Sequence, residues 1–596
     1  MITSSAALLK APLAGEVPAA AQRRPASDDA LLLLLISLLA CAALLTPFVF
    51  RAADDNRLTS WQWVFAGVPV AAFAALLVCA IAAAFALRTM ALPPRGAELW
   101  LFGISFAAGV PFWSEPEVIV DAARYFMQAK YLALYGAGAF AAAWGRELSA
   151  WTDLPLVPFL YGLIFRYAGE ERIYVQIFTT LLFSGTVVLT YRIGRELWDE
   201  TIGFYGAALL LGMPYLLTQV PLMLADVPAM FLVALAVFTT IKAFKRGGAG
   251  WIAAAAAAIT LALLSKYSAW LMLTVLVPVY WAHRRAAPQA AARRAAMIAG
   301  LALAAMSCLW LLADHGVVMA QLRLLWDYQR PGLGRWQESL VSTFVFQIHP
   351  FIIAAAAYSL YAAIRERDVK YAIIGWLLAL ALLGQIGRIR YLLALFPLLA
   401  LAAAYGWREI RNSKARAFAL FCTVIPSLTI AFLAYLPFLQ TVSAANLQRA
   451  GAHLNALDVA RVEVITLEQT HAAVHPAVSV PLLDLFARKP LAYRPALTPR
   501  PPPKGIDTSP LRFTWELAPA SYYLEDPAGG AQRTAIAVIA ADPAQPLPAH
   551  VAHQLAQHCL TGEFLRSEGV FAYQTLVRVY QQARADEPRC PHEGAA

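Results

Sequence analysis

The stretches SEPEVIVDAARYFMQAKYL (114–132) and WTDLPLVPFLYG (151–162) decide how the rest of the chain is interpreted. They directly follow one hydrophobic run and precede a long succession of others. They hold Glu115, Glu117, Asp121 and Asp153, the densest set of acids beside the apolar runs. Burial beside a bilayer is costly for a carboxylate, so acids kept there usually serve a function. We therefore predict that residues 114–172 contain a catalytic loop on the outer side of a membrane.

The composition predicts a polytopic membrane protein. Of 596 residues, 60% are hydrophobic and only 14% are charged, whereas soluble proteins have about 45–50% apolar and about 25% charged residues. The net charge of +10 comes from basic residues in short loops between apolar runs, which is the positive-inside pattern and excludes nucleic acid as a partner. The run Ala30–Phe50 is too long for a cleaved signal peptide and is predicted to be a retained helix.

About thirteen membrane spans are expected from the apolar runs. They lie near 30–50, 63–87, 97–113, 173–191, 201–219, 227–241, 251–265, 268–282, 295–314, 350–364, 371–386, 391–405 and 416–438. Alternate loops differ clearly in their content of Lys and Arg, and the more basic set is predicted to face the cytoplasm. This orientation puts the acidic loop and the C-terminal region outside a cytoplasmic (inner) membrane.

Four regions follow from this pattern. Residues 1–29 are expected to form a cytoplasmic tail, 30–96 two extra spans, 97–440 the transmembrane core, and 441–596 an extracytoplasmic α/β or α+β domain. Within that domain, 462–467, 534–540 and 569–580 are predicted as strands and 550–560 as a helix. Cys559 and Cys590 both fall in this region, where an oxidising compartment would allow a disulfide between them.

Asp121 is the leading candidate among the acids. Residues 121–132 have helical spacing, and a carboxylate at the start of a helix is favoured by the helix dipole and can cap the helix. Asp121 is therefore either the cap of an interfacial helix or an active-site acid. Glu115 and Glu117 are weaker candidates, because Ser-Glu-Pro-Glu is typical of a solvated turn.

Two further acids stand where apolar helices begin, each close to a proline. Asp153 precedes an apolar helix predicted near 156–167, and Asp226 opens the span near 227–241; each is either a cap or a functional acid. The cost of a carboxylate at membrane depth favours a function for Asp226. Lys266 interrupts an apolar stretch and could reach the membrane surface by snorkelling.

Arg388 and Arg390 lie on the predicted outer side, against the positive-inside trend, and so indicate an anionic partner. Arginine matches phosphate oxygens bidentately. Acids and cations thus converge at span ends on one face, which fits a phosphate-bearing lipid held by cations while an acid activates an acceptor. A transporter also carries charges, but in mid-span. The sequence has no nucleotide-binding Gly-rich loop, no HExxH and no supported GxSxG, which disfavours an ATP-driven pump or a hydrolase.

The run from Ala97 to about Phe438 resembles the GT-C membrane glycosyltransferases, within them the protein O-mannosyltransferase and lipid A aminoarabinose transferase branch. The matching features come in the family's order: the helix start Asp121-Ala122-Ala123-Arg124-Tyr125, then Leu154-Pro155-Leu156, Asp226-Val227-Pro228, Ser265-Lys266, and Arg390 to Pro397. Two departures stand out. Many relatives have an Asp-Glu pair where this chain has Asp121 and Ala122, and many have a lysine before Pro-Pro-Leu where it has Asp153 and Leu154.

This resemblance implies an inverting glycosyltransferase that moves a hexose or pentose from a polyprenyl-phosphate donor to a lipid, glycan or protein acceptor. Asp121 would be the general base, and Lys266, Arg388 and Arg390 would bind the donor phosphate. Acceptor or sugar orientation would fall to Asp153, Asp226, Arg124 and Tyr125. No cofactor is implied with certainty, although Asp153 and Asp226 could help to bind a divalent cation.

Two other classes of function stay open at this point. The chain could be a secondary transporter or flippase for a lipid-linked glycan, because such proteins also carry charged residues among their spans. Alternatively, the C-terminal domain could bind a partner, and the chain would then assist assembly only. Transfer of a sugar by the purified protein would separate the enzyme from both.

Overall fold

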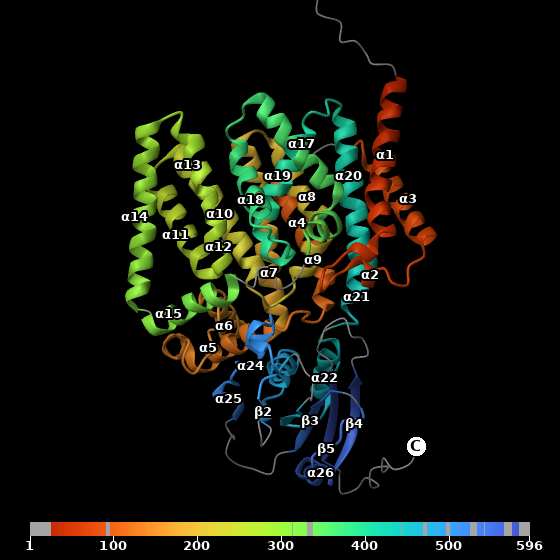
Figure 1. The fold of residues 1–596 in the computed structure, drawn as a ribbon, viewed down its shortest axis with the longest axis vertical. Helices are drawn as coiled ribbons and strands as arrows, with labels where there is room; N and C mark the ends of the chain where they lie inside the picture. Colours follow the sequence, from red (N-terminus) through yellow and green to blue (C-terminus); the bar gives the residue numbers. More distant parts are fainter. Residues whose placement is uncertain are drawn as a thin grey trace, which may run out of the picture.

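The computed structural model describes residues 26–90, 96–312, 314–330, 338–442, 444–468, 474–495, 501–524, 533–541, 543–565 and 575–582. Most of the described chain forms one bundle of helices, and a smaller domain containing a β-sheet stands at one end of the bundle (Figure 1). This agrees with the predicted helical membrane protein and its C-terminal α/β or α+β domain.

Long, strongly apolar helices make up the bundle. The first half contains α1 (Ala26–Val49), α2 (Trp61–Val64), α3 (Val70–Leu87), α4 (Ala97–Gly109), α5 (Ala122–Ala143), α6 (Leu156–Ala168), α7 (Arg172–Leu197), α8 (Glu200–Leu209), α9 (Pro214–Gln219) and α10 (Asp226–Arg246). The second half contains α11 (Ala249–Ser265), α12 (Tyr267–Met272), α13 (Leu276–Arg284), α14 (Pro288–Leu312), α15 (His315–Arg323), α17 (Pro350–Glu366), α18 (Tyr371–Leu383), α19 (Phe396–Trp407), α20 (Ser413–Ile430) and α21 (Leu436–Leu439).

The predicted count of about thirteen spans is not confirmed. Within the described residues, seven helices are long and apolar enough to cross a membrane, and four shorter apolar helices accompany them. Several predicted spans are interrupted, because 63–87 is divided between α2 and α3, 201–219 between α8 and α9, and 268–282 between α12 and α13. A run that is continuous in hydropathy can therefore contain a break in the helix that the sequence does not reveal.

The helices α1 and α3 pack on the rest of the bundle along α20, at the right of Figure 1. The connection between α1 and α2 is held by Asp54, whose buried carboxylate accepts hydrogen bonds from the backbone of Asn56 and Trp61 and from Ser342 and Gln347. The latter two residues belong to the π-helical turn Ser342–Ile348. A buried carboxylate is tolerated when its oxygens are satisfied in this way.

The C-terminal domain contains a mixed sheet of five strands in the order β2-β1-β3-β5-β4. The strands are β1 (Arg461–Thr466), β2 (Leu491–Arg494), β3 (Thr534–Ala540), β4 (His558–Leu565) and β5 (Leu576–Gln582). The strand β1 runs parallel to β2 and β3, whereas β5 is antiparallel to β3 and β4. Short helices accompany the sheet: α22 (Ala445–Ala456), α23 (Ser479–Asp484), α24 (Arg512–Trp515), α25 (Ser521–Leu524) and α26 (Ala549–Leu555).

The predictions for this domain are correct in part. The runs 462–467 and 534–540 form β1 and β3, and the last part of 569–580 lies in β5, whereas 569–574 is outside the described residues. The helix predicted over 550–560 ends at Leu555, and His558 begins the strand β4. Pairing with β5 overrides the helical pattern there. Cys559 is disulfide-bonded, and its predicted partner Cys590 lies outside the described residues.

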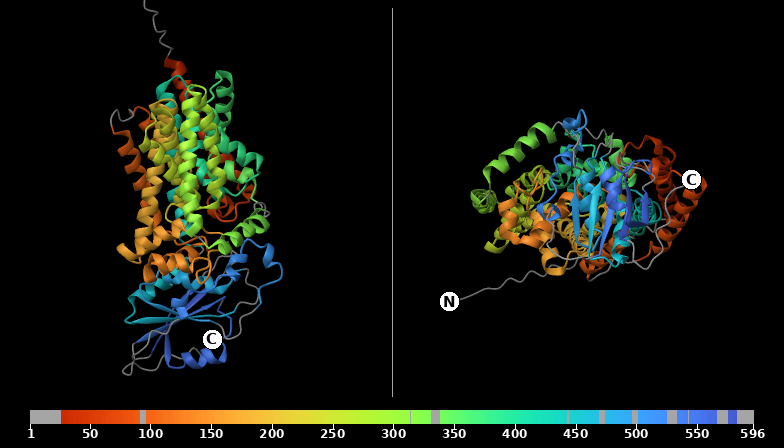
Figure 2. Two further views of the ribbon diagram at one scale, coloured as in Figure 1. Left: turned by 90° about the vertical axis from the view of Figure 1, so that its left-hand side faces the viewer. Right: turned by 90° about the horizontal axis from the view of Figure 1, so that it is seen from below.

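The helix α5 lies between the bundle and the C-terminal domain (Figure 2). Lys130 of this helix forms an ion pair with Asp484 of α23 at 2.7 Å, and the same carboxylate accepts a hydrogen bond from the hydroxyl of Tyr523 at 2.7 Å. The hydroxyl of Tyr522 also donates to the backbone oxygen of Met127 at 3.2 Å. The C-terminal domain is thus bound to the helix that begins beside Asp121.

Candidate active site

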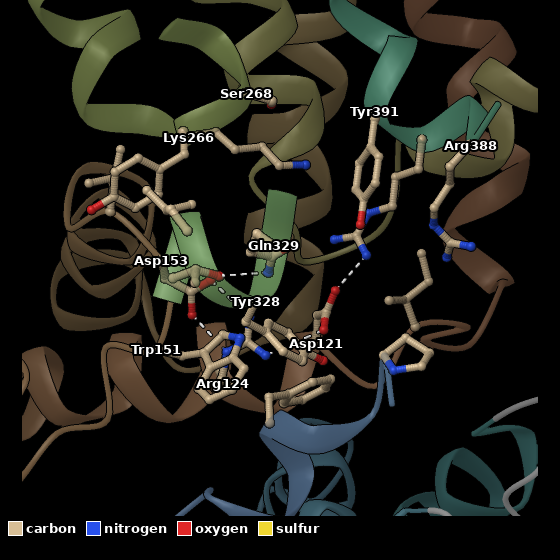
Figure 3. A pocket seen from close by; sticks show the side chains of 18 of the residues that line it. Asp121, Arg124, Trp151, Asp153, Lys266, Ser268, Tyr328, Gln329, Arg388 and Tyr391 are labelled. Carbon is tan, nitrogen blue, oxygen red and sulfur yellow. Dashed lines mark hydrogen bonds and ion pairs between the residues drawn. The ribbon is translucent and has the colours of Figure 1, made fainter. Parts of the chain in front are cut away.

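A cavity of about 360 Å³ lies where the bundle meets the C-terminal domain. Its lining residues come from six segments of the chain, namely 119–125, 151–154, 265–272, 325–330, 386–391 and 510–513. Figure 3 shows their side chains converging from helices of the bundle above and from the acidic loop and the C-terminal domain below. The acidic loop therefore forms one wall of a cavity that distant segments complete.

Asp121 lies on this wall and is the residue immediately before α5. Its side chain makes no capping hydrogen bond to the helix. One carboxylate oxygen instead contacts Nη1 of Arg390 at 2.5 Å, and the other contacts Nη1 of Arg124 at 3.4 Å. About a fifth of the side chain remains exposed. Asp121 is therefore an acid that faces cations across the cavity, and the interpretation as a simple helix cap is wrong.

These cations control the ionisation of Asp121. Burial on its own would raise the pKa of a carboxyl group, but the charges of Arg390 and Arg124, the hydrogen bond from Arg390 and the charge of Lys266 outweigh it and lower the pKa to about 2. The group is consequently a carboxylate throughout the neutral range. A carboxylate so strongly paired is a weak base until one of its cationic partners turns to another anion.

Arg124 links the two acids of the loop. Its Nε and Nη2 atoms bind the two carboxylate oxygens of Asp153 at 2.8 and 2.9 Å, which is the bidentate geometry of a strong ion pair. The amide of Gln128 also approaches Asp153, at 3.3 Å. Tyr125 is buried and lines the cavity next to Arg124. The sequence stretch that carries Asp121 thus also supplies the residue that holds Asp153.

A second cluster of charges lies on the side of the membrane helices. Lys266, between α11 and α12, contacts one carboxylate oxygen of Asp226 at 2.5 Å, and Nε of Arg390 contacts the other at 3.0 Å. Arg390 therefore bridges Asp121 and Asp226, which lie in separate parts of the sequence. The neighbouring Arg388 pairs with Glu338 at 2.9 Å. Lys266 is consequently a member of a charge network, and the interpretation as a snorkelling residue is wrong.

The lining residues carry more positive than negative charge. Five are cationic and two are carboxylates: Arg124, Lys266, Arg330, Arg388 and Arg390 against Asp121 and Asp153. Such a cavity attracts anions, and arginine forks suit phosphate oxygens. All the site residues predicted from the sequence lie in or next to this cavity: Asp121, Arg124, Tyr125, Asp153, Lys266, Arg388 and Arg390 line it, and Asp226 binds two of them.

The donor set does not suit a metal ion. Asp153 is bound by Arg124, and Asp226 by Lys266 and Arg390, so the carboxylates expected to help bind a cation are already neutralised by side chains. The described part of the chain contains no group of three or more His, Cys, Asp and Glu side chains placed to hold a metal.

The interpretation of Glu115 and Glu117 as a solvated turn is wrong. Both side chains are buried. Glu117 pairs with Arg172 at 2.9 Å and accepts hydrogen bonds from the backbone of Met223. Burial raises the pKa of both carboxyl groups, most strongly that of Glu115. Arg172 lies at the start of α7, far along the chain from Glu117, and no local pattern indicated that the two residues would pair.

Several residues that line the cavity were not predicted from the sequence, among them Trp151, Tyr328, Arg330 and Phe513. Aromatic residues are common throughout this chain, with 16 Trp, 23 Tyr and 30 Phe, so single ones do not stand out. Trp151 alone carries a usable signal, because it directly precedes the acid-bearing Thr-Asp-Leu-Pro segment.

Comparison with known proteins finds a family match over part of the chain and a solved structure with a similar fold. Residues 153–311 match the family described as dolichyl-phosphate-mannose-protein mannosyltransferase. The crystal structure of ArnT from Cupriavidus metallidurans bound to undecaprenyl phosphate superposes with a TM-score of 0.50, at 12% identity, over 82% of this chain and 98% of ArnT. The archaeal oligosaccharyltransferase AglB from Archaeoglobus fulgidus gives 0.42 at 11% identity, over 62% of each chain. No curated protein sequence matches the chain.

Proposed function

We propose that this membrane protein is a glycosyltransferase with the GT-C fold, similar to ArnT and to the protein mannosyltransferases. It transfers a sugar from a polyprenyl-phosphate donor to an acceptor on the outer face of the cytoplasmic membrane. The transfer inverts the configuration of the anomeric carbon. The single observation that carries the proposal is the bridge from Asp121 through Arg390 to Asp226 and Lys266. This arrangement puts a carboxylate beside a cluster of cations inside one cavity.

In this mechanism the cations that bind the phosphate and the base Asp121 lie on opposite sides of the anomeric carbon of the sugar. The donor phosphate binds Lys266 and Arg390, with Arg388 next to them, while the acceptor approaches Asp121. The acceptor oxygen attacks the anomeric carbon from the face opposite the phosphate, the bond from carbon to the phosphate oxygen breaks, and Asp121 takes the acceptor's proton. The departing phosphate carries the released electron pair, and the cations stabilise its charge. One direct displacement inverts the anomeric configuration.

Donor binding also activates the base in this mechanism. Arg390 is held by two carboxylates, so binding a phosphate requires it to loosen at least one of them. When Arg390 turns toward phosphate, the pKa of Asp121 rises from its low value, because the strongest lowering charge has acquired another anion. Asp121 then becomes a better proton acceptor while it is still ionised at neutral pH. The donor is therefore expected to bind before the acceptor reacts.

The decisive experiment is a transfer assay with the full-length protein purified into lipid nanodiscs. Radiolabelled hexose and pentose donors on undecaprenyl phosphate are supplied with membranes of the source cells as acceptor. Label that moves from the donor to an acceptor component supports the proposal. Donor that crosses the bilayer of a proteoliposome without losing its sugar would overturn it in favour of the transporter.

Lys266 gives a more specific prediction. Lys266→Met should raise the donor KM by about 10- to 150-fold and change kcat less, because a cation that contacts the phosphate contributes about 1.5–3 kcal/mol through a charged hydrogen bond. The measurement is the initial rate of transfer against donor concentration. Lys242→Met is a matched control, since Lys242 forms a buried pair with Glu196 at 2.5 Å. It lies near the end of α10 opposite Asp226, the partner of Lys266, and about 24 Å from Asp226 along the helix. Equal donor KM values for the two variants would contradict the role of Lys266.

A further inference from the structure

The C-terminal domain contributes directly to the wall of the cavity. Pro510, Leu511 and Phe513, from the short helix α24 and the residues before it, line the cavity together with the acidic loop. The ring of Phe513 is buried and lies under the guanidinium of Arg124, whose central carbon is 4.3 Å from the ring centroid. The nitrogen atoms of the Arg124 guanidinium thus bind the carboxylates of Asp121 and Asp153, and one face of the guanidinium packs on a ring from the C-terminal domain.

From this geometry we infer that the C-terminal domain completes the active site, and that Phe513 is a positioning residue which holds Arg124 against Asp121 and Asp153. The inference rests on the proposed function, because it assigns a task to a residue of the same cavity. A planar guanidinium can bind carboxylates with its edge while an aromatic ring covers its face. The ring excludes water from that face, so both ion pairs lie in a less polar environment and are stronger than they would be in water.

Two further aromatic residues hold Phe513 in place. Trp151 lies 5.6 Å from Tyr328 and 6.4 Å from Phe513 between ring centroids, and the hydroxyl of Tyr328 donates to the backbone oxygen of Ser509. The backbone of Trp151 has a φ of +46°. Bulky residues rarely adopt this left-handed conformation, and surrounding contacts must maintain it. The three rings therefore join the acidic loop, the segment before residue 330 and the C-terminal domain.

Phe513 lies away from the residues proposed to bind the donor phosphate. In Figure 3 Lys266 and Arg388 lie on the side of the membrane helices, whereas Arg124 and Trp151 lie on the side of the C-terminal domain. Phe513 contacts Arg124, which belongs to the latter group. A change at Phe513 should therefore alter the state of the acids and leave the binding of the phosphate unchanged.

The C-terminal domain should remain docked when Phe513 is changed. Lys130 and Asp484 form an ion pair across the same interface, and Tyr522 binds the backbone oxygen of Met127. These contacts involve α5 one to two turns beyond Arg124. Replacement of one ring consequently removes the stacking on Arg124 without removing what fixes the domain.

The test compares Phe513→Leu with Phe513→Tyr in the transfer assay described above. Leucine keeps most of the volume but has no aromatic face, so kcat should fall roughly tenfold, whereas tyrosine should restore it to within about twofold. The acid limb of the pH profile of kcat should move to higher pH in the leucine variant, because a looser Arg124 lowers the pKa of Asp121 less. The affinity for undecaprenyl phosphate alone should stay unchanged in both variants.

A matched control is Phe564→Leu, at a half-buried ring of β4 in the same domain whose contact is with His453; it should leave kcat and the pH profile unchanged. The inference is overturned if Phe513→Leu has the wild-type kcat and pH profile, if leucine and tyrosine behave alike, or if the affinity for undecaprenyl phosphate falls in step with kcat.

A second measurement separates the failure of this inference from the failure of the proposed function. If the wild-type protein transfers no sugar, the proposed function fails, and thermal unfolding in nanodiscs then decides about Phe513. The effect of Phe513→Leu on Tm should be clearly smaller in an Arg124→Gln background than in the wild type, because the stacking is already lost there. Additive shifts in Tm would overturn the inference.

Discussion

Asp121→Asn is expected to reduce kcat for sugar transfer by about 10²–10⁴-fold, which is the usual contribution of a general base. Asparagine is nearly the same size but cannot take the acceptor's proton. The fold should persist, because Arg390 keeps Asp226 as a partner and Arg124 keeps Asp153. Measurement of kcat with the labelled donor, together with thermal unfolding, checks both expectations.

The same variant makes a less obvious prediction about donor binding. Asp121 pairs with Arg390 and would compete with the phosphate proposed to bind there, so its neutralisation should leave the affinity for undecaprenyl phosphate unchanged or make it higher. Asp314→Asn is a suitable control, since Asp314 forms an ion pair with the exposed Arg146 outside the cavity. Turnover near that of the wild type would remove Asp121 as the base. A large loss of phosphate affinity would instead show that the carboxylate supports the site structurally.

Arg390→Ala is expected to weaken donor binding by at least about thirtyfold, since truncating one partner of a buried charge pair costs about 2–5 kcal/mol. The variant removes the cation that joins Asp121 to Asp226 and that is proposed to bind the phosphate. Titration with undecaprenyl phosphate measures this loss directly. Arg390→Lys should give an intermediate affinity, because lysine keeps the charge but not the bidentate fork. An unchanged affinity in the alanine variant would show that Arg390 has no contact with the donor.

The pH dependence of Arg390→Ala follows from the pKa of Asp121. In the wild type this pKa is about 2, and Arg390 is its strongest lowering influence. Without Arg390, the pKa of Asp121 should be higher, because burial raises it and only Arg124 and Lys266 remain to lower it. A base works only when ionised, so activity is present above its pKa and disappears as the pH falls through it. The residual activity of the variant should therefore decline at a higher pH than that of the wild type.

The charged residues of the site were predictable, because a charged side chain next to apolar membrane segments has a large free-energy cost unless it is paired or reaches water. Asp226, Lys266, Arg388 and Arg390 interrupt apolar runs, and each had to find a partner of opposite charge or reach water. The structure brings them together with Asp121 and Asp153, as the sequence predicted. Their roles in binding and catalysis remain predictions. The partner of Arg388 was not foreseen, because Glu338 lies in a loop that carries no motif.

What the sequence could not provide comes from contacts between distant segments. Phe513 and Arg124 are almost four hundred positions apart, and nothing in either segment indicates their stacking. The breaks in the helices at 63–87 and 268–282 were hidden, because hydropathy averages over a window and does not detect a short irregular turn. Residues 558–560 form part of β4 and not a helix, because they pair with β5. Strand pairing depends on residues distant in the sequence, which a local helical pattern does not contain.

The two ion pairs of Arg390, with Asp121 and Asp226, should also affect which anions can bind in the cavity. Inorganic phosphate and other small soluble anions can offer only their charge, and that charge must displace Asp121 or Asp226, which are already bound. A phosphate attached to a prenyl chain is anchored in the bilayer by about 0.8 kcal/mol for each buried CH₂, so it is concentrated at the membrane beside the cavity whereas a soluble phosphate is not. We therefore expect the cavity to select against soluble phosphates and to admit a phosphate that arrives from the membrane.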